Sequence, residues 1–168
     1  MPALGTTALL ILVPAAEPLL EAARAVNPAT VRPGLPAHVT VSYPFVPFTE
    51  DLTAAVHSLA ADTSPIDLTL AEVVVRPGFL AVTAPGAQEL ADRAGQRWPW
   101  LRPYDGRFGE RPPTHLTVAL GASAGEADRI GEQVRALLPI RLAATGLELV
   151  ERTVRGWQVR LSAPFGPG

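Results

Sequence analysis

Two of the three histidines in this chain head the same four-residue pattern, histidine-aliphatic-threonine-valine. The first copy begins at His38 in "AHVTVS", and the second begins at His115 in "THLTVA". Random placement of so few histidines rarely produces such a repeat, so the coincidence indicates a shared role. An imidazole can carry a proton near neutral pH, and a hydroxyl can donate a hydrogen bond, so both residue types suit a catalytic site.

Each pattern predicts a strand that presents an imidazole and a hydroxyl on one face. On a strand, residues i and i+2 face the same side, so His38 lies with Thr40 and His115 lies with Thr117. The aliphatic residues between them face the other side and anchor the strand in a core. Each strand therefore presents one acid-base group and one hydrogen-bond donor on the same face.

Two such strand faces, directed toward one another, would suit phosphodiester cleavage. One imidazole can act as general base on the attacking group while the other acts as general acid on the leaving oxygen. The two hydroxyls can donate hydrogen bonds to the non-bridging oxygens of a tetrahedral anion. The predicted catalytic residues are His38, Thr40, His115 and Thr117.

The elements around the two patterns follow one another in the same order in both halves of the chain. In each half a helix precedes the His-x-Thr strand, a second helix follows it, and a hairpin comes next. The predicted helices cover 16–26, 49–62, 87–98 and 124–138, and the predicted hairpins pair 65–75 with 79–84 and 140–151 with 154–163. The simplest explanation is an internal duplication.

A duplication predicts an α+β fold with two lobes, each an antiparallel sheet with helices, related by a pseudo-two-fold axis. The repeated halves cover approximately 15–84 and 85–163, and the two His-x-Thr patterns line a central cleft between them. No linker separates the halves, so we expect a single domain over 1–168, in which terminal elements can be swapped between the lobes.

Composition narrows the possible functions. The chain has 168 residues, of which 48% are hydrophobic, and this is enough for a buried core. The formal net charge is -2, so we expect no binding to long DNA, whereas a small nucleotide or an RNA terminus suits the chain. There is no cysteine, and all 14 basic residues are arginine, which excludes thiol chemistry and a catalytic or P-loop lysine.

The N-terminal region predicts a cytoplasmic protein that does not associate with membranes. The residues before Ala8 carry no basic group, and the apolar run from Ala8 to Val13 is short for a signal peptide. No stretch approaches the roughly 18 consecutive apolar residues of a membrane span. We also expect the protein to act as a monomer.

A loop rich in proline, glycine, aromatic residues and arginine approaches the second histidine. Its rings could stack on a nucleobase, and its guanidinium groups could contact phosphate or ribose. Alternatively, the rings cover the core, and the arginines pair with Asp105 and Glu110. The candidate substrate-binding residues are Phe45, Trp100, Tyr104, Arg107, Phe108 and Arg111.

Two further residues near the patterns are predicted to have no role at the site. Tyr43 falls on the strand face of Val39 and Val41, opposite the histidines, so packing is expected. His57 falls one residue off the apolar stripe of its helix, so it is expected to be solvated.

The two patterns resemble the 2H phosphoesterase superfamily, which includes 2'-5' RNA ligase-like proteins and cyclic nucleotide phosphodiesterases. The stretches "LPAHVTVSYPF" and "RWPWLRPYDGRF" are similar to a bacterial 2'-5' RNA ligase-like branch, and the resemblance covers nearly the whole chain. It implies a bilobal fold with a central cleft, chemistry without a metal or cofactor, and substrates such as 2',3'-cyclic phosphates or 2'-5' linkages. It also implies that His115 is the base and His38 the acid, which the symmetry of the motifs does not decide.

One position departs from the family pattern, and three alternatives stay open. RNA ligase members often carry an arginine at the position of Leu120. The cleft could bind a nucleotide or RNA end without turnover, or could serve non-phosphate chemistry in secondary metabolism. A zinc enzyme is disfavoured, because two histidines without a third ligand close in sequence make a poor zinc site.

Overall fold

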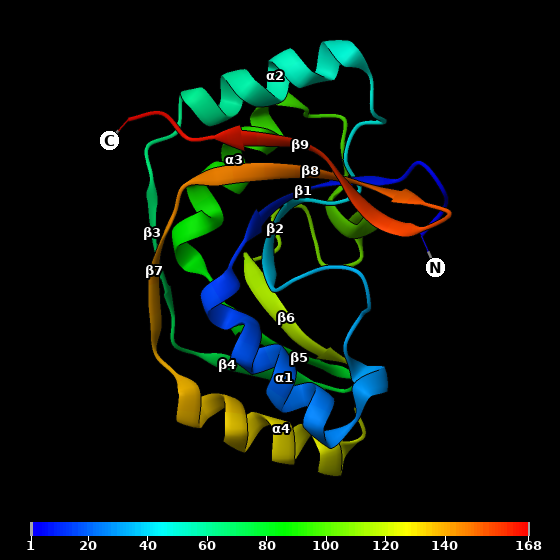
Figure 1. Ribbon diagram of the computed structural model, residues 1–168, viewed down its shortest axis with the longest axis vertical. Helices are drawn as coiled ribbons and strands as arrows, with labels where there is room; N and C mark the ends of the chain where they lie inside the picture. The colour runs from blue at the N-terminus through cyan, green and yellow to red at the C-terminus, as the bar shows by residue number, and fades with distance from the viewer. Residues whose placement is uncertain (1, 168) are drawn as a thin grey trace.

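The structure, a computed structural model, describes residues 2–167 (Figure 1). The helices are α1 Glu17–Val26, α2 Glu50–Ala61, α3 Gln88–Arg97 and α4 Ala124–Leu137. The strands are β1 Thr7–Leu12, β2 His38–Ser42, β3 Ile66–Leu70, β4 Val73–Arg76, β5 Phe79–Thr83, β6 His115–Leu120, β7 Ile140–Ala144, β8 Gly146–Thr153 and β9 Gly156–Pro164. The predicted α+β class is confirmed.

Local signals explain where the two helices that follow the His-x-Thr strands begin. Thr49 caps the N-terminus of α2, because its side chain accepts a hydrogen bond from the Leu52 N–H. Helix α4 begins with a capping box, in which Ser123 and Glu126 satisfy each other's backbone N–H groups. A few adjacent residues therefore determine where each of these two helices begins.

The two His-x-Thr strands lie side by side at the centre of a seven-stranded antiparallel sheet. The strand order is β4-β5-β6-β2-β1-β8-β9 (Figure 1), and β2 and β6 join at the pair Val39 and Leu116. Both of these residues are fully buried. The strands of the two halves thus meet in one continuous sheet at this junction.

The order of elements repeats along the chain and across the sheet. The series from β1 to β4 is followed by a similar series from β5 to β8. Strand β4 pairs with β5, and β8 pairs with β1, so each series lends its last strand to the other. We therefore propose that the repeat units begin at β1 and β5, before the boundaries at 15 and 85 that the pattern suggested.

Both predicted hairpins are confirmed, but the first arm of each is divided into two strands. Strands β4 and β5 form one hairpin, and β8 and β9 form the other. The preceding strands β3 and β7 leave the main sheet and pair with each other over Ile66–Leu70 and Ile140–Ala144. Periodicity along 65–75 or 140–151 does not reveal this partner, because the pairing joins segments far apart in sequence.

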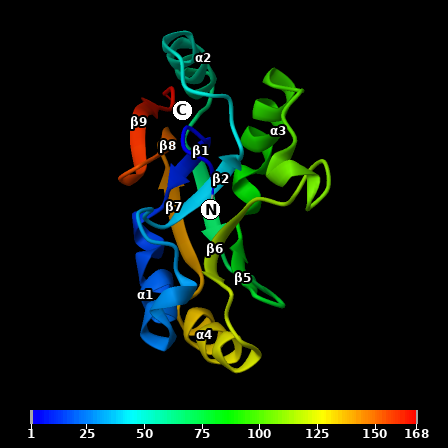
Figure 2. The same cartoon turned by 90° about the vertical axis from the view of Figure 1, so that its right-hand side faces the viewer.

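The helices pack on one side of the sheet and leave β2 and β6 open on the other. Helix α1 contacts β6, α3 contacts β2, α2 contacts β8 and β9, and α4 contacts β4 and β5. Figure 2 shows α1 and α3 flanking the central strands, with α2 and α4 at the two ends of the molecule. Within residues 2–167, no helix combines the length and the hydropathy that crossing a membrane requires.

Phe45, predicted to bind substrate, instead belongs to the core. It is 5% exposed and meets Trp98 edge to face, with ring centroids 4.7 Å apart. Backbone contacts hold it there, because its N–H donates to the Thr7 carbonyl oxygen at 2.9 Å and the Thr7 hydroxyl donates to the Val46 carbonyl oxygen at 2.6 Å. The segment after β2 is thus fastened to β1 with Phe45 turned inward.

We expect Phe45→Ala to lower the free energy of unfolding by about 3 to 5 kcal/mol, because it removes a buried ring and leaves a cavity against Trp98. Urea denaturation followed by circular dichroism measures the change. Trp100→Ala is the matched control, since Trp100 is 67% exposed and its removal should change stability by no more than about 0.5 kcal/mol. Equal losses in the two variants would contradict the core assignment of Phe45.

Candidate active site

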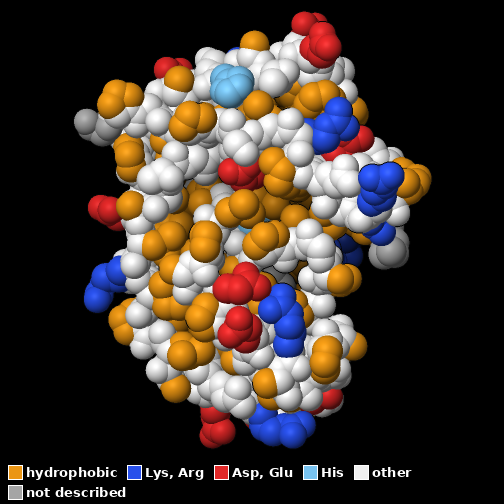
Figure 3. Space-filling model, viewed as in Figure 1, with side chains coloured by type: hydrophobic (Ala, Val, Ile, Leu, Met, Phe, Trp, Pro, Cys, Tyr) orange, Lys and Arg blue, Asp and Glu red, His pale blue; other side chains and the backbone are white. Residues whose placement is uncertain are grey.

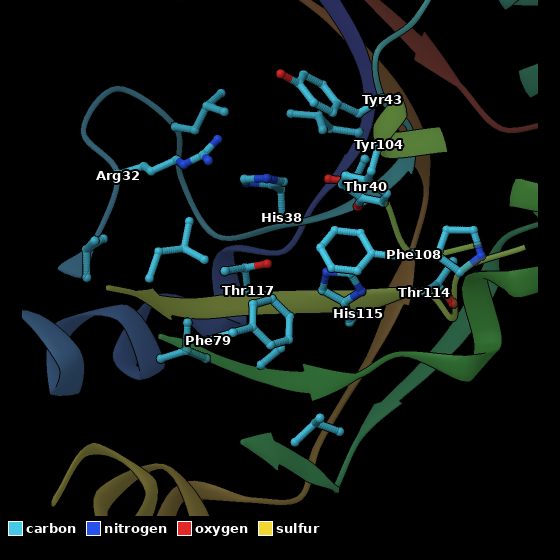
Figure 4. Close-up of a pocket in the computed structure, with 18 of the residues that line it drawn as sticks. Arg32, His38, Thr40, Tyr43, Phe79, Tyr104, Phe108, Thr114, His115 and Thr117 are labelled. Carbon is cyan, nitrogen blue, oxygen red and sulfur yellow. The ribbon is translucent and has the colours of Figure 1, made fainter. Parts of the chain in front are cut away.

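A cleft of about 800 Å³ opens over β2 and β6 (Figure 4). All four residues of the repeated pattern line it, namely His38, Thr40, His115 and Thr117. They reach it because the alternation on each strand turns Val39 and Leu116 into the core and the pattern residues away from it.

The strand register sets the arrangement of the four side chains. Because β2 and β6 are antiparallel and Val39 pairs with Leu116, His38 lies beside Thr117 and Thr40 lies beside His115 (Figure 4). The two imidazoles therefore occupy opposite corners of a quadrilateral, and diagonal neighbours across antiparallel strands are about 7 to 8 Å apart. This spacing leaves room for one tetrahedral group that touches both rings and both hydroxyls.

The same hydrogen bond orients both imidazoles. Nδ1 of His38 lies 2.8 Å from the carbonyl oxygen of Pro36, and Nδ1 of His115 lies 2.9 Å from that of Pro113. A carbonyl oxygen only accepts, so Nδ1 is the protonated nitrogen and donates, which leaves Nε2 of the neutral ring free to accept a proton. The proline two positions before each histidine is thus part of the repeated pattern, which sequence reasoning did not use.

The surroundings of His38 disfavour its charged form. Burial lowers the pKa of His38 from its ordinary value, and the positive charges of Arg32 and His115 lower it further, while the hydrogen bond to Pro36 acts in the opposite direction. Figure 4 shows the Arg32 side chain directed toward His38. At neutral pH the ligand-free cleft therefore holds His38 as the neutral imidazole.

Aromatic rings fix the plane of His115. Phe79 meets it edge to face, with ring centroids 5.5 Å apart and an interplanar angle of 81°. Tyr104 stacks on it, with centroids 6.2 Å apart and an angle of 25°. His38 has no such pair of rings among its aromatic contacts within residues 2–167, so the two halves of the site differ despite their shared pattern.

The loop before β6 is held over the cleft in a strained conformation. Tyr104 and Asp105 both adopt left-handed backbone angles, with φ of 51° and 55°. The Tyr104 N–H donates to the Tyr43 carbonyl oxygen at 2.7 Å. Burial raises the pKa of the Tyr104 phenol, against the effect of its hydrogen bond with Thr40, so the phenol stays protonated beside that hydroxyl.

The cleft is positively charged although the chain is not. Arg32, Arg76 and Arg107 line it, and no Asp or Glu among residues 2–167 does. On the face drawn in Figure 3, by contrast, acidic and basic side chains are interspersed. Guanidinium groups without carboxylates nearby attract an anion, so the cleft is suited to a phosphate-bearing ligand.

Flat apolar surfaces accompany these charges. Half of the chain's ten aromatic side chains line the cleft, and they are Tyr43, Phe79, Tyr104, Phe108 and Trp157. Tyr43 contacts both Tyr104 and Trp157, with ring centroids 5.9 and 6.4 Å apart. Such a group of rings can stack on a planar base.

The structure brings half of the six predicted binding residues to the cleft. Tyr104, Arg107 and Phe108 line the cleft, whereas Trp100 and Arg111 do not. Trp100 points into solvent, and Arg111 makes a bidentate pair with Asp92 of α3, with its Nε 2.8 Å from Oδ1. The alternative that a loop arginine pairs with a carboxylate therefore applies to Arg111, with a partner outside the loop.

Sequence reasoning missed several lining residues. Tyr43 was assigned to the opposite face, but β2 ends at Ser42, so the strand alternation no longer applies to it. Arg32 and Arg76 were not singled out, although each begins an Arg-Pro-Gly tripeptide and this repeat is visible in the sequence.

Comparison with known proteins agrees with this geometry. The family model described as the 2'-5' RNA ligase superfamily matches residues 12–156. Similar solved structures include E. coli LigT in its apo form, with a TM-score of 0.58, and E. coli LigT complexed with NADP+, with a TM-score of 0.52. Each is 16% identical and covers 98% of this chain and 99% of the LigT chain, so the likeness shows a shared fold. Comparison with curated protein sequences gave no match.

The ligand types that a metal ion would need are the next feature of the site. Over residues 2–167, no three His, Cys, Asp or Glu side chains are grouped so that they could hold a metal ion. The candidate site thus consists of two imidazoles, two hydroxyls, guanidinium groups and aromatic rings.

We expect Arg32→Gln to raise the pKa of His38, because it removes one of the positive charges that disfavour the imidazolium. An NMR pH titration of the three histidines measures the effect, and wild-type His38 should titrate below the ordinary value of about 6.5. Arg111→Gln is the control, since its guanidinium pairs with Asp92 outside the cleft. A His38 titration that is the same in wild type and Arg32→Gln would contradict this electrostatic account.

Proposed function

Because the chain belongs to the 2'-5' RNA ligase superfamily, we propose that it is a metal-independent phosphodiesterase. Its substrate is a 2',3'-cyclic phosphate or a 2'-5' phosphodiester in a nucleotide or at an RNA end, which it hydrolyses or reversibly forms. The observation that carries the proposal is the quadrilateral of two imidazoles and two hydroxyls in one cleft. Two imidazoles can move both protons without a further group.

In this proposal the reacting phosphate lies between the four side chains. The hydroxyls of Thr40 and Thr117 donate hydrogen bonds to its non-bridging oxygens and stabilise the charge that builds up on them. One histidine accepts a proton at Nε2 from the attacking water as the new P–O bond forms. The other histidine, protonated, gives its proton to the ribose oxygen as the old P–O bond breaks. Exchange with solvent then resets both rings.

The charge and shape of the cleft support a nucleotide substrate. Arg32, Arg76 and Arg107 attract its phosphate groups, with no carboxylate in the lining among residues 2–167 to compete. The aromatic side chains offer stacking surfaces to its base. We propose that the protein acts as a monomer on a nucleotide or RNA terminus in the cytoplasm.

A binding module that does not turn its ligand over is the second candidate. Leu120 favours it, because this side chain lines the cleft at the position where RNA ligase members often carry an arginine. A guanidinium that would contact the transition state from this position is therefore missing. Tight binding of a nucleotide without product after prolonged incubation would support this second function.

We expect EDTA-treated protein to turn over at least one member of a panel of 2',3'-cyclic nucleotides, cyclic-phosphate-ended oligonucleotides and 2'-5' dinucleotides. His38→Ala and His115→Ala should each lower kcat/KM by about 100-fold or more, since each removes one proton-transfer step. Thr40→Val and Thr117→Val should lower it by about 100-fold, because each removes one donor to the phosphoryl oxygens.

The matched control for these variants is His57→Ala, since His57 is exposed on α2 and does not line the cleft. It should retain wild-type kcat/KM. Full activity in either variant of the paired histidines would overturn the mechanism, and so would activity that is lost to EDTA and restored by a metal ion.

The pH dependence of kcat/KM should separate the roles of the two histidines. A general base must be neutral in the free enzyme, and the lowered pKa of His38 favours this role for it in hydrolysis, whereas the family resemblance assigns the base to His115. We expect a bell-shaped profile whose acidic limb moves to higher pH in Arg32→Gln, because the limb follows deprotonation of the base. A shift of the basic limb alone would identify His38 as the acid.

A further inference from the structure

The cleft has two chemically different ends. One end lies beyond His38 and Thr117 and carries Arg32, which Figure 4 shows on that side, away from the tyrosines. The other end lies beyond Thr40 and His115, where Tyr43 and Tyr104 contact one another. We call the first the arginine end and the second the aromatic end.

The strand register places a second arginine at the arginine end. Thr117 pairs with Ala81, whereas Leu120, farther along β6, pairs with Phe79 of β5. Phe79 in turn pairs with Arg76 of β4. Directly paired residues face the same side of a sheet, so Arg76 lies in the row that passes beyond Thr117, and it lines the cleft.

Both arginines are followed by the same kind of turn. Each is followed by proline and then by a glycine with a left-handed backbone, Gly34 at φ 89° and Gly78 at φ 71°. Proline restricts φ of the turn, and glycine accepts the left-handed angle without a steric penalty. The two Arg-Pro-Gly turns therefore fix the backbone that follows Arg32 and Arg76, and both arginines line the cleft.

These two guanidinium groups have no counter-charge within the described residues. The ion pairs of residues 2–167 join Arg24 with Glu17, Arg111 with Asp92 and Arg160 with Glu151, and none involves Arg32 or Arg76. No carboxylate from this part of the chain lines the cleft either. Two guanidinium groups that line one cleft and lack an ion-pair partner among the described residues are suited to bind an anion.

The reacting phosphate does not account for this second positive site. It lies in the middle of the cleft, where the quadrilateral of His38, Thr40, His115 and Thr117 holds it in the proposed mechanism. On a ribose, the base on C1' and the 5' carbon on C4' share one face of the ring, but C1' adjoins C2' and C4' adjoins C3', so the two groups lie beyond opposite ends of the 2',3' edge. When the 2',3' edge faces the centre and the base stacks at the aromatic end, the 5' oxygen is directed toward the arginine end.

We propose that Arg32 and Arg76 bind a phosphate attached to the 5' oxygen of the nucleoside that carries the reacting phosphate. This inference rests on the proposed function and narrows its substrate class. The preferred substrate carries two phosphate groups, one reacting at the 2' or 3' oxygen and one held at the 5' oxygen. A nucleoside 2',3'-cyclic phosphate without a 5' phosphate is a poorer substrate.

Binding of product analogues tests the site without requiring turnover. Isothermal titration calorimetry compares adenosine 2'-phosphate with adenosine 2',5'-bisphosphate, and the corresponding 3' isomers, on the full chain. In wild type we expect the bisphosphate to bind about tenfold tighter or more, because charge-assisted hydrogen bonds to a second phosphate are added. In Arg32→Gln and in Arg76→Gln this gain should shrink to about threefold or less.

Two control variants separate the 5' subsite from general effects of charge. Arg107→Gln removes a guanidinium from the loop that carries Tyr104 and Phe108 and should weaken both ligands alike, so the gain from the 5' phosphate persists. Arg155→Gln removes an exposed charge outside the cleft lining and should change neither affinity. Equal affinity of wild type for mono- and bisphosphate, or a gain that survives both Arg32→Gln and Arg76→Gln, would overturn the proposal.

Kinetics distinguish this proposal from the proposed function and identify the source of the phosphate. If the bisphosphate binds tighter but no substrate is turned over, the 5' phosphate subsite is supported and the phosphodiesterase proposal is wrong. If substrates with and without a 5' phosphate are turned over with the same kcat/KM, the phosphodiesterase proposal is supported and the 5' phosphate subsite is wrong. A greater gain with a short RNA that ends in a cyclic phosphate identifies an internal phosphodiester as the natural ligand, and a greater gain with a 5'-phosphorylated mononucleotide identifies a phosphomonoester.

Discussion

The antiparallel pairing of β2 with β6 is the contact on which both the fold and the site depend. Val39 and Leu116 pair across it, and both are fully buried. A slip of one residue would turn the imidazoles and hydroxyls into the core and the aliphatic side chains into the cleft, because alternate residues of a strand face opposite sides. The hydrophobic cost of that slip therefore fixes the register, and the register in turn sets the spacing of the two histidines.

The two halves of the site are alike only in the immediate contacts of their histidines. Both imidazoles donate to the carbonyl oxygen of a proline two residues earlier, and both stand beside a threonine of the other strand. Around them, however, His38 has a guanidinium nearby, and His115 is packed between Phe79 and Tyr104. The two histidines thus follow one sequence pattern but have unlike surroundings, and at His38 these surroundings disfavour the charged form.

The charge of the cleft differs from the net charge of the chain. The chain as a whole is slightly acidic, with a formal net charge of -2, yet the lining of the cleft contains arginines and, within residues 2–167, no carboxylate. Outside the cleft, the loop arginine Arg111 pairs with Asp92. A small anion entering the cleft meets a positive field, although the formal net charge of the chain is negative.

The sequence by itself determined the helices, the hairpins and the face on which each His-x-Thr pair lies, because these depend on periodicity within a few adjacent residues. Only the tertiary structure decided which strands are neighbours: β3 pairs with β7, and β2 joins β6. It also decided which side chains near the patterns reach the cleft, turning Phe45 into the core and Tyr43 into the site. Arg32 and Arg76 line one cleft for the same reason. Local sequence patterns do not encode the distance between segments that meet only when the chain folds.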